Sequence, residues 1–339
     1  MERPSLVHMA AGYMHAKTLY VTVELGIAEA LAAGPRACAD IAKETGTDPG
    51  ALRKLLRSLV GLGLATQLDT ETYELTEEGG QLCADRPDSM RDAVLLSAAP
   101  ELWRAWGDLA TIVRTGEPSR QPVTGWTPLE WLLQDPEGSV KMHRLGGDQT
   151  RALAPGIAEA CDVARFGTVA DIGGGDGTLI AGILTATPGL HGILYDLPTA
   201  VATAPPTLTA AGVADRCDVL GGDFFTSVPS GADAYVLKYI VHDWNDDQVI
   251  TILGHCRAVI PDSGRLFIVE TVMPPIMTAG HPWADDDLGV LVGCGGAERT
   301  EDEYRVLFAA AGFTLTSVSD VLVGGEPSGV HAIEATPIA

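Results

Sequence analysis

The spacing of apolar residues is most regular after Phe166. From there, short apolar runs alternate with helical stretches, and the runs are apolar on both faces, as buried parallel strands are. Strands are expected at 168–172, 191–196, 217–220, 234–240 and 264–270. Two more strand-like runs, joined by a glycine-rich turn, end the chain. This order predicts a doubly wound α/β domain, a Rossmann-like fold, that ends in an antiparallel hairpin.

Two of the expected helices have a clear start. The segments "NDDQ", Asn245–Gln248, and "TEDE", Thr300–Glu303, fit a capping box. In such a box the first side chain and the one three positions on satisfy each other's backbone amides. We therefore expect helices to begin directly after Asn245 and Thr300.

Residues 1–100 show a different pattern, with short amphipathic helices and then a small hairpin at "TQLDTETYELTEEG". Helix, turn, helix and hairpin is the outline of a winged helix, so a DNA-binding regulator has to be considered. The second helix of this unit carries Arg53, Lys54 and Arg57, but acidic residues lie close by and the segment is acidic overall. A packing or dimerisation module is the structural alternative.

The segment from 101 to 160 is expected to form connecting helices. Four of the six tryptophans lie in or near it: Trp103, Trp106, Trp126 and Trp131. Such aromatic residues form core or line an apolar pocket between domains. The sequence thus predicts a winged-helix-like N-terminal domain at 1–100, connecting helices at 101–160 and a ligand-binding α/β domain at 161–339.

The composition excludes some classes of binding partner. The 339 residues carry a net charge of −23, which argues against nucleic acid and against an anionic membrane surface. Six cysteines are scattered without CxxC spacing, as free thiols in a reducing cytosol would be. No apolar run is long enough for a membrane span or placed as a signal peptide. We therefore expect a cytoplasmic protein, and the acidic excess suits a cationic ligand.

Chemically distinctive residues follow the ends of the five strands, where open α/β sheets bind their ligands. In strand order they are Gly173–Gly177, Asp196, Asp223 with Phe224, Lys238 with His242, Asp243 and Trp244, and finally Glu270. This gathering of glycines, carboxylates, a lysine and a histidine at one sheet edge is the strongest functional signal in the chain.

The glycine loop reads Gly173-x-Gly175-x-Gly177 and departs from the dinucleotide fingerprint GxGxxG. Counted from Gly173, the sixth position of that fingerprint is Thr178 instead of glycine. A nicotinamide dehydrogenase is therefore disfavoured. Glycines still let the backbone approach a ligand closely. Asp196 lies at a distance suited to the ribose hydroxyls of an adenosine ligand.

The motifs "VADIGGGDGTL", "YDLP", "GGDFF", "LKYIVHDW", "GRLFIVE" and "GGAERT" stand in a distinctive order. In this order they resemble the S-adenosylmethionine-dependent O-methyltransferases of the caffeic-acid/hydroxyindole type, in particular their bacterial natural-product branch. The similarity covers nearly the whole chain, and "ELGIAEAL" with "LRKLLRSLVGLGL" resembles the dimerisation domain of that family. The resemblance implies methyl transfer from S-adenosylmethionine to a phenolic hydroxyl of a small aromatic secondary metabolite. It also implies S-adenosylhomocysteine as product, a homodimer formed through the N-terminal domain, and no metal.

The resemblance also assigns roles to residues. His242 matches the general base, flanked by Glu270 and Glu298. Those expected around the cofactor are Asp171, Gly173, Gly175, Asp196, Asp223, Phe224, Lys238 and Trp244. Those expected to line the substrate pocket, between the connecting helices and "HPWADDDLGVLVGCGG", are Met142, His143, Trp283, Asp287 and Leu291.

Several alternatives stay open at this point. Glu298 rests on "GGAERT" alone and could simply pair with Arg299, and Trp244 could be core. Some proteins with this resemblance use the cofactor site for chemistry other than methylation. An amine or a carboxylate could replace the hydroxyl as acceptor.

Overall fold

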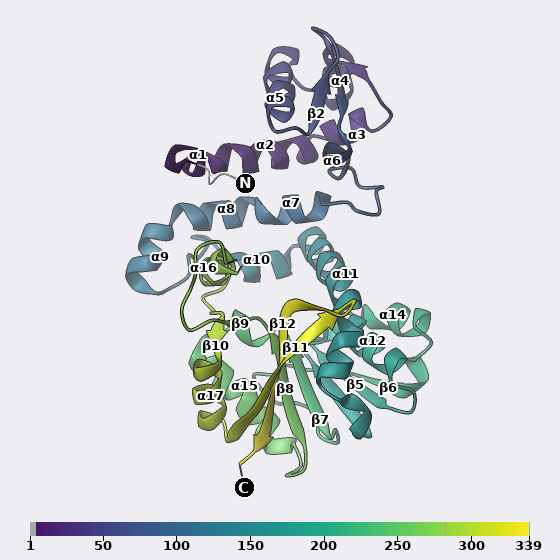
Figure 1. Ribbon diagram of the computed structural model, residues 1–339, viewed down its shortest axis with the longest axis vertical. Coiled ribbons are helices and arrows are strands. Elements are labelled where there is room, and N and C mark those ends of the chain that lie inside the picture. Colours follow the sequence, from purple (N-terminus) through teal and green to yellow (C-terminus); the bar gives the residue numbers. More distant parts are fainter. Residues whose placement is uncertain (1–4, 282, 339) are drawn as a thin grey trace. The chain divides into compact units, whose positions relative to one another are not determined.

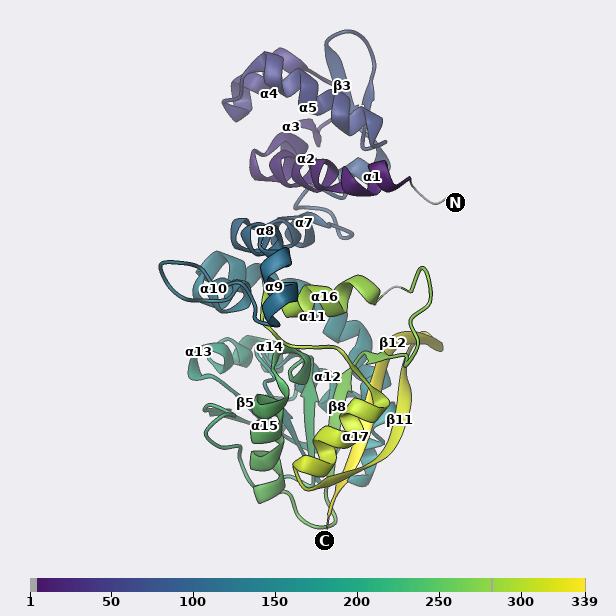
Figure 2. The same cartoon turned by 90° about the vertical axis from the view of Figure 1, so that its left-hand side faces the viewer.

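The structure, a computed structural model, describes residues 5–281 and 283–338. It leaves out the side chains of residues 136, 137, 139–145 and 148. The chain separates into two compact units, Met1–Arg104 and Ala105–Ala339, and each is described by itself (Figures 1 and 2).

The first unit consists of short helices around a three-stranded antiparallel sheet of order β1-β3-β2. Its helices are α1 (Leu6–Ala10), α2 (Gly12–Glu24), α3 (Ile27–Leu31), α4 (Cys38–Thr45), α5 (Pro49–Gly61), α6 (Glu77–Gly80) and α7 (Arg91–Ser97); helix α8 (Pro100–Gly107) contains the boundary. Its strands are β1 (Arg36–Ala37), β2 (Ala65–Gln67) and β3 (Thr72–Leu75). Strands β2 and β3 form the expected hairpin.

Local sequence explains the central helices of this unit. Helix α4 ends at Gly46, whose φ of +68° is easy for glycine. Helix α5 then begins with Asp48 as N-cap and Pro49 in its first turn. The apolar face of α5 places Leu56 and Leu59 in a core where both are fully buried.

The second unit is built on a seven-stranded sheet of order β11-β12-β8-β7-β4-β5-β6. Its strands are β4 (Thr168–Ile172), β5 (His191–Asp196), β6 (Cys217–Gly221), β7 (Ala234–Lys238), β8 (Arg265–Glu270), β11 (Phe313–Val323) and β12 (Glu326–Pro337), and β9 (Val272–Met273) pairs separately with β10 (Arg299–Thr300). Its α-helices are α9 (Leu109–Thr115), α10 (Pro128–Gln134), α11 (Pro136–Ala160), α12 (Thr178–Ala186), α13 (Pro198–Val201), α14 (Ala204–Ala210), α15 (Asp246–Val259), α16 (Ala284–Gly293) and α17 (Glu301–Ala310). Three short 3-10 helices, η1 (Val163–Arg165), η2 (Ala214–Arg216) and η3 (Val241–Asp243), complete it.

The sheet is covered on both faces, as a doubly wound fold requires. Helices α11, α12 and α14 pack on one face, and α15 with α17 pack on the other (Figures 1 and 2). Strands β4 to β8 run parallel, so their carboxyl ends lie along one edge of the sheet. The predicted α/β class is therefore confirmed.

The last two strands form the predicted antiparallel hairpin. Val323 pairs with Glu326 across a two-residue turn, Gly324-Gly325. Both turn glycines have positive φ, +61° and +89°, and a tight hairpin of this kind favours glycine for that reason. Both predicted capping boxes are also present, at Asn245 and at Thr300.

Two strand predictions need correction. Strand β6 is not buried on both faces, because it is the outer strand of the sheet and residues 218–221 are exposed. Strand β7 ends at Lys238, not at 240, because Tyr239 has a φ of +52° that breaks the extended backbone.

Within the described residues, none of the helices combines the length and apolar character that crossing a bilayer requires. The six cysteines are all free thiols, and five of them are buried.

Candidate active site

The glycine loop after β4 is restricted to glycine by its backbone angles at some positions and by lack of space at Gly173 and Gly174. Gly173, Gly175 and Gly177 all have positive φ, between +57° and +77°. A Cβ on Gly173 would lie 2.4 Å from the Cδ1 of Ile240, and one on Gly174 would lie 2.5 Å from an oxygen of Asp171. Glycine is therefore required here by both backbone angle and space.

Asp196, at the end of β5, shapes this loop. Its Oδ2 accepts the backbone N–H of Gly175 at 2.8 Å, and its Oδ1 accepts the N–H of Leu197 at 2.6 Å. Through these two bonds the carboxylate ties the glycine loop to the end of β5.

An aromatic cluster stands next to the loop. The side chain of Asp223 accepts the N–H of Phe225 at 2.8 Å and so fixes the turn after β6. The rings of Phe224 and Phe225 meet Trp244 edge to face, with centroids 6.1 and 4.7 Å away. The structure thus brings Phe224 and Trp244 together, although they come from different strand ends.

Asp171, which is buried, and Lys238, which is half-buried, are ionisable groups at the ends of the neighbouring strands β4 and β7. Burial raises the pKa of Asp171 to about 7, with Lys238 opposing this, and lowers the pKa of Lys238 to about 8. One oxygen of Asp171 is buried without a hydrogen-bond partner among the described residues. The Lys238 ammonium lies 4.0 Å from the centre of the Tyr239 ring.

His242 lies on η3, just after β7. Its Nδ1 is 2.8 Å from Oε1 of Glu298, and its Nε2 is 3.6 Å from Oδ1 of Asp243. Burial lowers the pKa of His242, but the hydrogen bond that the ring donates to Glu298 and the negative charges of Glu270, Asp243 and Glu298 outweigh it and raise the pKa to about 9. The imidazole is thus held between two carboxylates that favour its cation.

Glu270 contributes to the site differently from Glu298. Its side chain is fully buried, and its Oε1 accepts three successive backbone N–H groups, of Ile240, Val241 and His242, at 3.0, 2.6 and 3.1 Å. Its Oε2 accepts the hydroxyl of Tyr304 at 2.6 Å. Glu270 thus binds the backbone that carries His242, and its charge helps to raise the pKa of the imidazole; its predicted role beside the base stays a prediction.

Glu298 is held in place by its own surroundings. Its backbone N–H donates to Asp287 Oδ1 at 3.0 Å, and its side chain is only 6% exposed. The alternative that Glu298 pairs with Arg299 is wrong. Arg299 is buried and instead binds Asp246 at 2.9 Å and the carbonyl oxygens of Val241 and Trp244.

The predicted substrate residues are only partly placed. Asp287 and Leu291 lie on α16, and Trp283 is its N-cap residue. Asp287 orders Glu298, as described above. The side chains of Met142 and His143 lie outside the described residues, so their predicted roles stay predictions.

Sequence reasoning missed Tyr239. Its ring is stacked on that of His242, with centroids 5.5 Å apart and planes 11° from parallel. Its positive φ leaves no signal in the sequence, because a tyrosine at this angle is uncommon.

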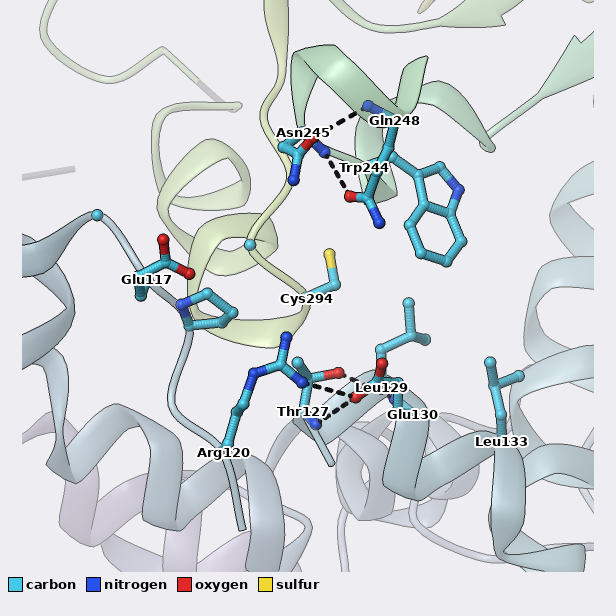
Figure 3. A pocket seen from close by; sticks show the side chains of 13 residues that line it. Glu117, Arg120, Thr127, Leu129, Glu130, Leu133, Trp244, Asn245, Gln248 and Cys294 are labelled. Atoms are coloured by element: carbon cyan, nitrogen blue, oxygen red, sulfur yellow. Dashed lines mark hydrogen bonds and ion pairs between the residues drawn. The ribbon is translucent and has the colours of Figure 1, made fainter. Parts of the chain in front are cut away.

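A small cavity lies nearby in the same unit, with a volume of about 170 Å³. Its wall includes Leu129 and Leu133 of α10, Cys294 and, of the predicted site residues, Trp244 (Figure 3). Ligand pockets usually measure ~300–1,000 Å³. The cavity is thus too small to be the acceptor pocket of an aromatic substrate by itself.

Comparison with known proteins decides the family. A family model described as O-methyltransferase domain matches residues 106–314, and one described as O-methyltransferase dimerisation domain matches residues 7–84. The chain belongs to the O-methyltransferases. The N-terminal match favours the dimerisation interpretation of the winged-helix-like unit over a DNA-binding regulator.

Several relatives of this methyltransferase cover nearly its full length. Phenazine O-methyltransferase PhzM of Lysobacter antibioticus is 36% identical over 98% of this chain and 96% of its own. The 8-amino-8-demethylriboflavin N,N-dimethyltransferase of Streptomyces davaonensis is 35% identical over 88% of this chain and 87% of its own. The crystal structure of NcsB1, an O-methyltransferase from neocarzinostatin biosynthesis in complex with S-adenosylmethionine and 2-hydroxy-5-methyl naphthoic acid, has a TM-score of 0.84 at 32% identity over 96% of both chains.

This methyltransferase therefore uses S-adenosylmethionine as cofactor, and its residues fit that molecule. The glycine loop offers a cradle that a single Cβ would fill, and the unpartnered oxygen of Asp171 can accept a ligand N–H. The surrounding carboxylates suit a sulfonium cation. Among the described residues no group of His, Cys, Asp and Glu is arranged to hold a metal ion.

Proposed function

We propose that this methyltransferase acts on a phenolic hydroxyl of a small aromatic natural product, with His242 as general base. The 2.8 Å contact between His242 and Glu298, on a turn that Glu270 holds at the sheet edge, carries the proposal. PhzM is named for a phenazine, and NcsB1 was crystallised with a hydroxynaphthoic acid; both relatives support an aromatic acceptor.

The acceptor's proton sets the chemical problem. S-adenosylmethionine supplies an activated methyl group on a positively charged sulfur. A phenol has a pKa of ~10, so only about one molecule in a thousand is ionised at pH 7. Taking up that proton in the site is worth up to ~4 kcal/mol, within the ~10²–10⁴-fold that a positioned base contributes.

The carboxylates around His242 match its pKa to this task. An ordinary histidine, with a pKa of ~6.5, is ~3.5 units weaker than phenolate, so proton transfer to it costs ~5 kcal/mol. With a pKa of about 9 for His242, the gap shrinks to ~1 unit, or ~1.4 kcal/mol. The same high pKa means that His242 is protonated in most enzyme molecules at pH 7 and cannot act as a base there. The rate of methyl transfer should therefore rise with pH up to about 9. Glu298 on Nδ1 leaves Nε2 as the nitrogen that takes the proton.

We assign the cofactor to the loop and strand ends. Asp171, Gly173 and Gly175 would surround its methionine part, and Asp196 would bind the ribose hydroxyls. Asp223, Phe224 and Trp244 would contact the adenine, and Lys238 would also line the cofactor site. Trp283, Asp287 and Leu291, with Met142 and His143, would line the acceptor pocket.

The N-terminal unit is the proposed dimer interface, supported by its match to the dimerisation domain. The division at residues 100 and 160 stays a prediction. A homodimer would be seen as a molecular mass twice that of the 35.5 kDa chain in light scattering.

A nitrogen acceptor is the second candidate. The relative from Streptomyces davaonensis is named for N,N-dimethylation of an aminoriboflavin. An aromatic amine also loses a proton on methylation, so the same base could serve it.

A mass-spectrometric assay tests both. The full-length protein receives S-adenosylmethionine and a panel of phenols, hydroxynaphthoates, hydroxyphenazines and anilines. A product heavier by one methylene with wild type, lost with His242→Gln and kept with His191→Gln, supports the base. His191 is a suitable control because it lies at the opposite end of β5 and pairs with Asp218. Equal product from wild type and His242→Gln would rule out the base, and products from anilines alone would favour the nitrogen acceptor.

A further inference from the structure

Tyr239 has an uncommon backbone conformation next to the base. Its φ is +52°, and among the described residues only Asp162 is another non-glycine with positive φ. Left-handed backbone is disfavoured for side chains with a Cβ, and such residues concentrate at functional sites.

The left-handed turn accomplishes two things. It ends β7 and directs the next three N–H groups to Oε1 of Glu270. It also places the Tyr239 ring nearly parallel to the imidazole of His242, 11° from coplanar. The strained backbone of Tyr239 therefore forms the turn that holds His242 in position.

The ring of Tyr239 is itself fixed. The ammonium of Lys238 lies 4.0 Å from its centre, and its hydroxyl accepts a long hydrogen bond from Gln149 at 3.5 Å. The ring also packs on the core between the sheet and helices α11 and α12. An aromatic face held this way attracts a nearby cation.

We propose that Tyr239 is a positioning residue for the base: its ring fixes the plane of the His242 imidazole and stabilises the imidazolium. This proposal rests on the proposed role of His242. In that role the acceptor O–H bond would break and its proton would move to Nε2. The acceptor oxygen would take the methyl group as the bond between that carbon and the cofactor's sulfur breaks, which leaves S-adenosylhomocysteine, and the proton would then pass from Nε2 to solvent.

Other charged groups also face His242. They are Glu298 directly before β10, Asp243 on η3, Glu270 at the end of β8, and Asp286 on α16. None of them changes in a substitution of Tyr239. A shift in the titration of His242 in such a variant therefore reports the ring.

Three variants separate the ring, the hydroxyl and the backbone. Tyr239→Phe keeps the ring, Tyr239→Leu removes it, and Tyr239→Gly removes it while relieving the left-handed strain. The Gly variant keeps the test open if the Leu variant fails to fold. The titration of His242 is followed by NMR on full-length, histidine-labelled protein with S-adenosylhomocysteine, and the signal is assigned by its loss in His242→Gln.

The expected result is a fall of ~0.5–1 unit in the pKa of His242 for the Leu and Gly variants, from the ~0.5–2 kcal/mol of a cation–π contact. The Phe variant should match wild type. The pH profile of kcat should move with the NMR value, and near pH 9.5, where the base is neutral in wild type and variants, kcat should fall by up to ~3–10-fold with KM little changed. Unchanged titration in the Leu and Gly variants, or an equal shift in all three, would overturn the proposal. Full activity of His242→Gln would instead overturn the proposed base, whatever the NMR shows.

Discussion

The substitution Glu298→Gln tests most directly how this site sets the strength of its base. Glutamine has nearly the shape of glutamate, and its oxygen can still accept the Nδ1–H of His242. What disappears is the negative charge 2.8 Å from the ring. The change therefore isolates the electrostatic part of the contact.

The size of the effect follows from the surroundings of His242. Its pKa lies at about 9, compared with the ordinary 6.5, a rise of ~2.5 units or ~3.4 kcal/mol. The hydrogen bond to the charged Glu298 is the largest contribution that raises it, while the charges of Glu270 and Asp243 remain in the variant. A hydrogen bond to a neutral amide oxygen is roughly half as strong as one to a carboxylate, so we expect the pKa to fall by about 1 unit.

The two pH profiles should cross. At pH 7 only ~1% of wild-type His242 is neutral, and a lower pKa raises that fraction ~10-fold. Above pH 9 both bases are neutral, and the weaker base of the variant is slower, by at most tenfold for each unit lost. The variant should thus gain on wild type near pH 7 and lose to it near pH 9.5.

The assay is kcat/KM for methyl transfer between pH 6 and 10, with S-adenosylmethionine saturating. Asp302→Asn, an exposed charge change on α17, serves as control and should leave the profile unchanged. A variant profile parallel to that of wild type, lower by the same factor at every pH, would refute the reasoning. Glu298 would then position the ring without tuning its proton affinity.

Three further outcomes are expected. Glu270→Gln should destabilise the fold by ~1–3 kcal/mol in urea unfolding, because three N–H groups and the Tyr304 hydroxyl lose an anionic acceptor; unchanged stability would contradict that role. Asp171→Asn should raise the apo Tm at pH 8 and weaken S-adenosylhomocysteine binding in calorimetry. The Asp171 carboxyl, with its pKa near 7 instead of 3.8, costs up to ~4 kcal/mol of stability as pH rises from 4 to 7; a lower Tm would count against this. Gly173→Ala should abolish cofactor binding, because the new Cβ would clash with Ile240. The control Gly189→Ala is also at positive φ but has open space around it, so it should lower Tm and leave the cofactor affinity intact. Equal losses of affinity in the two variants would exclude the clash.

The elements of the second unit were predictable because their signals are local. Alternating apolar runs and capping residues such as Asn245 and Thr300 act within a few positions. The exposure of β6 was not predictable, since it depends on which strand ends the sheet. Whether a strand lies at the edge depends on the order of all strands in the sheet, and the residues of β6 themselves do not indicate it.

The site was predictable as a set of residues more than as an arrangement. Strand-end reasoning and the family resemblance found His242, Glu270 and Glu298, but not that Glu270 binds backbone and Glu298 binds the ring. That distinction depends on Tyr239, whose positive φ turns three amides toward one carboxylate. Tyr304 and Arg299 contact residues far away in the sequence, and no local pattern predicts those contacts.

The turn held by Glu270 also bears on how the enzyme comes into being. His242 leaves the ribosome before three of the residues that hold its turn and ring in place, Glu270, Glu298 and finally Tyr304. Strand β8, which carries Glu270, is itself flanked by β12 near the end of the chain. A nascent chain that already contains the whole glycine loop and the histidine therefore has no organised base, and methyl-transfer competence arrives only with the C-terminal strands.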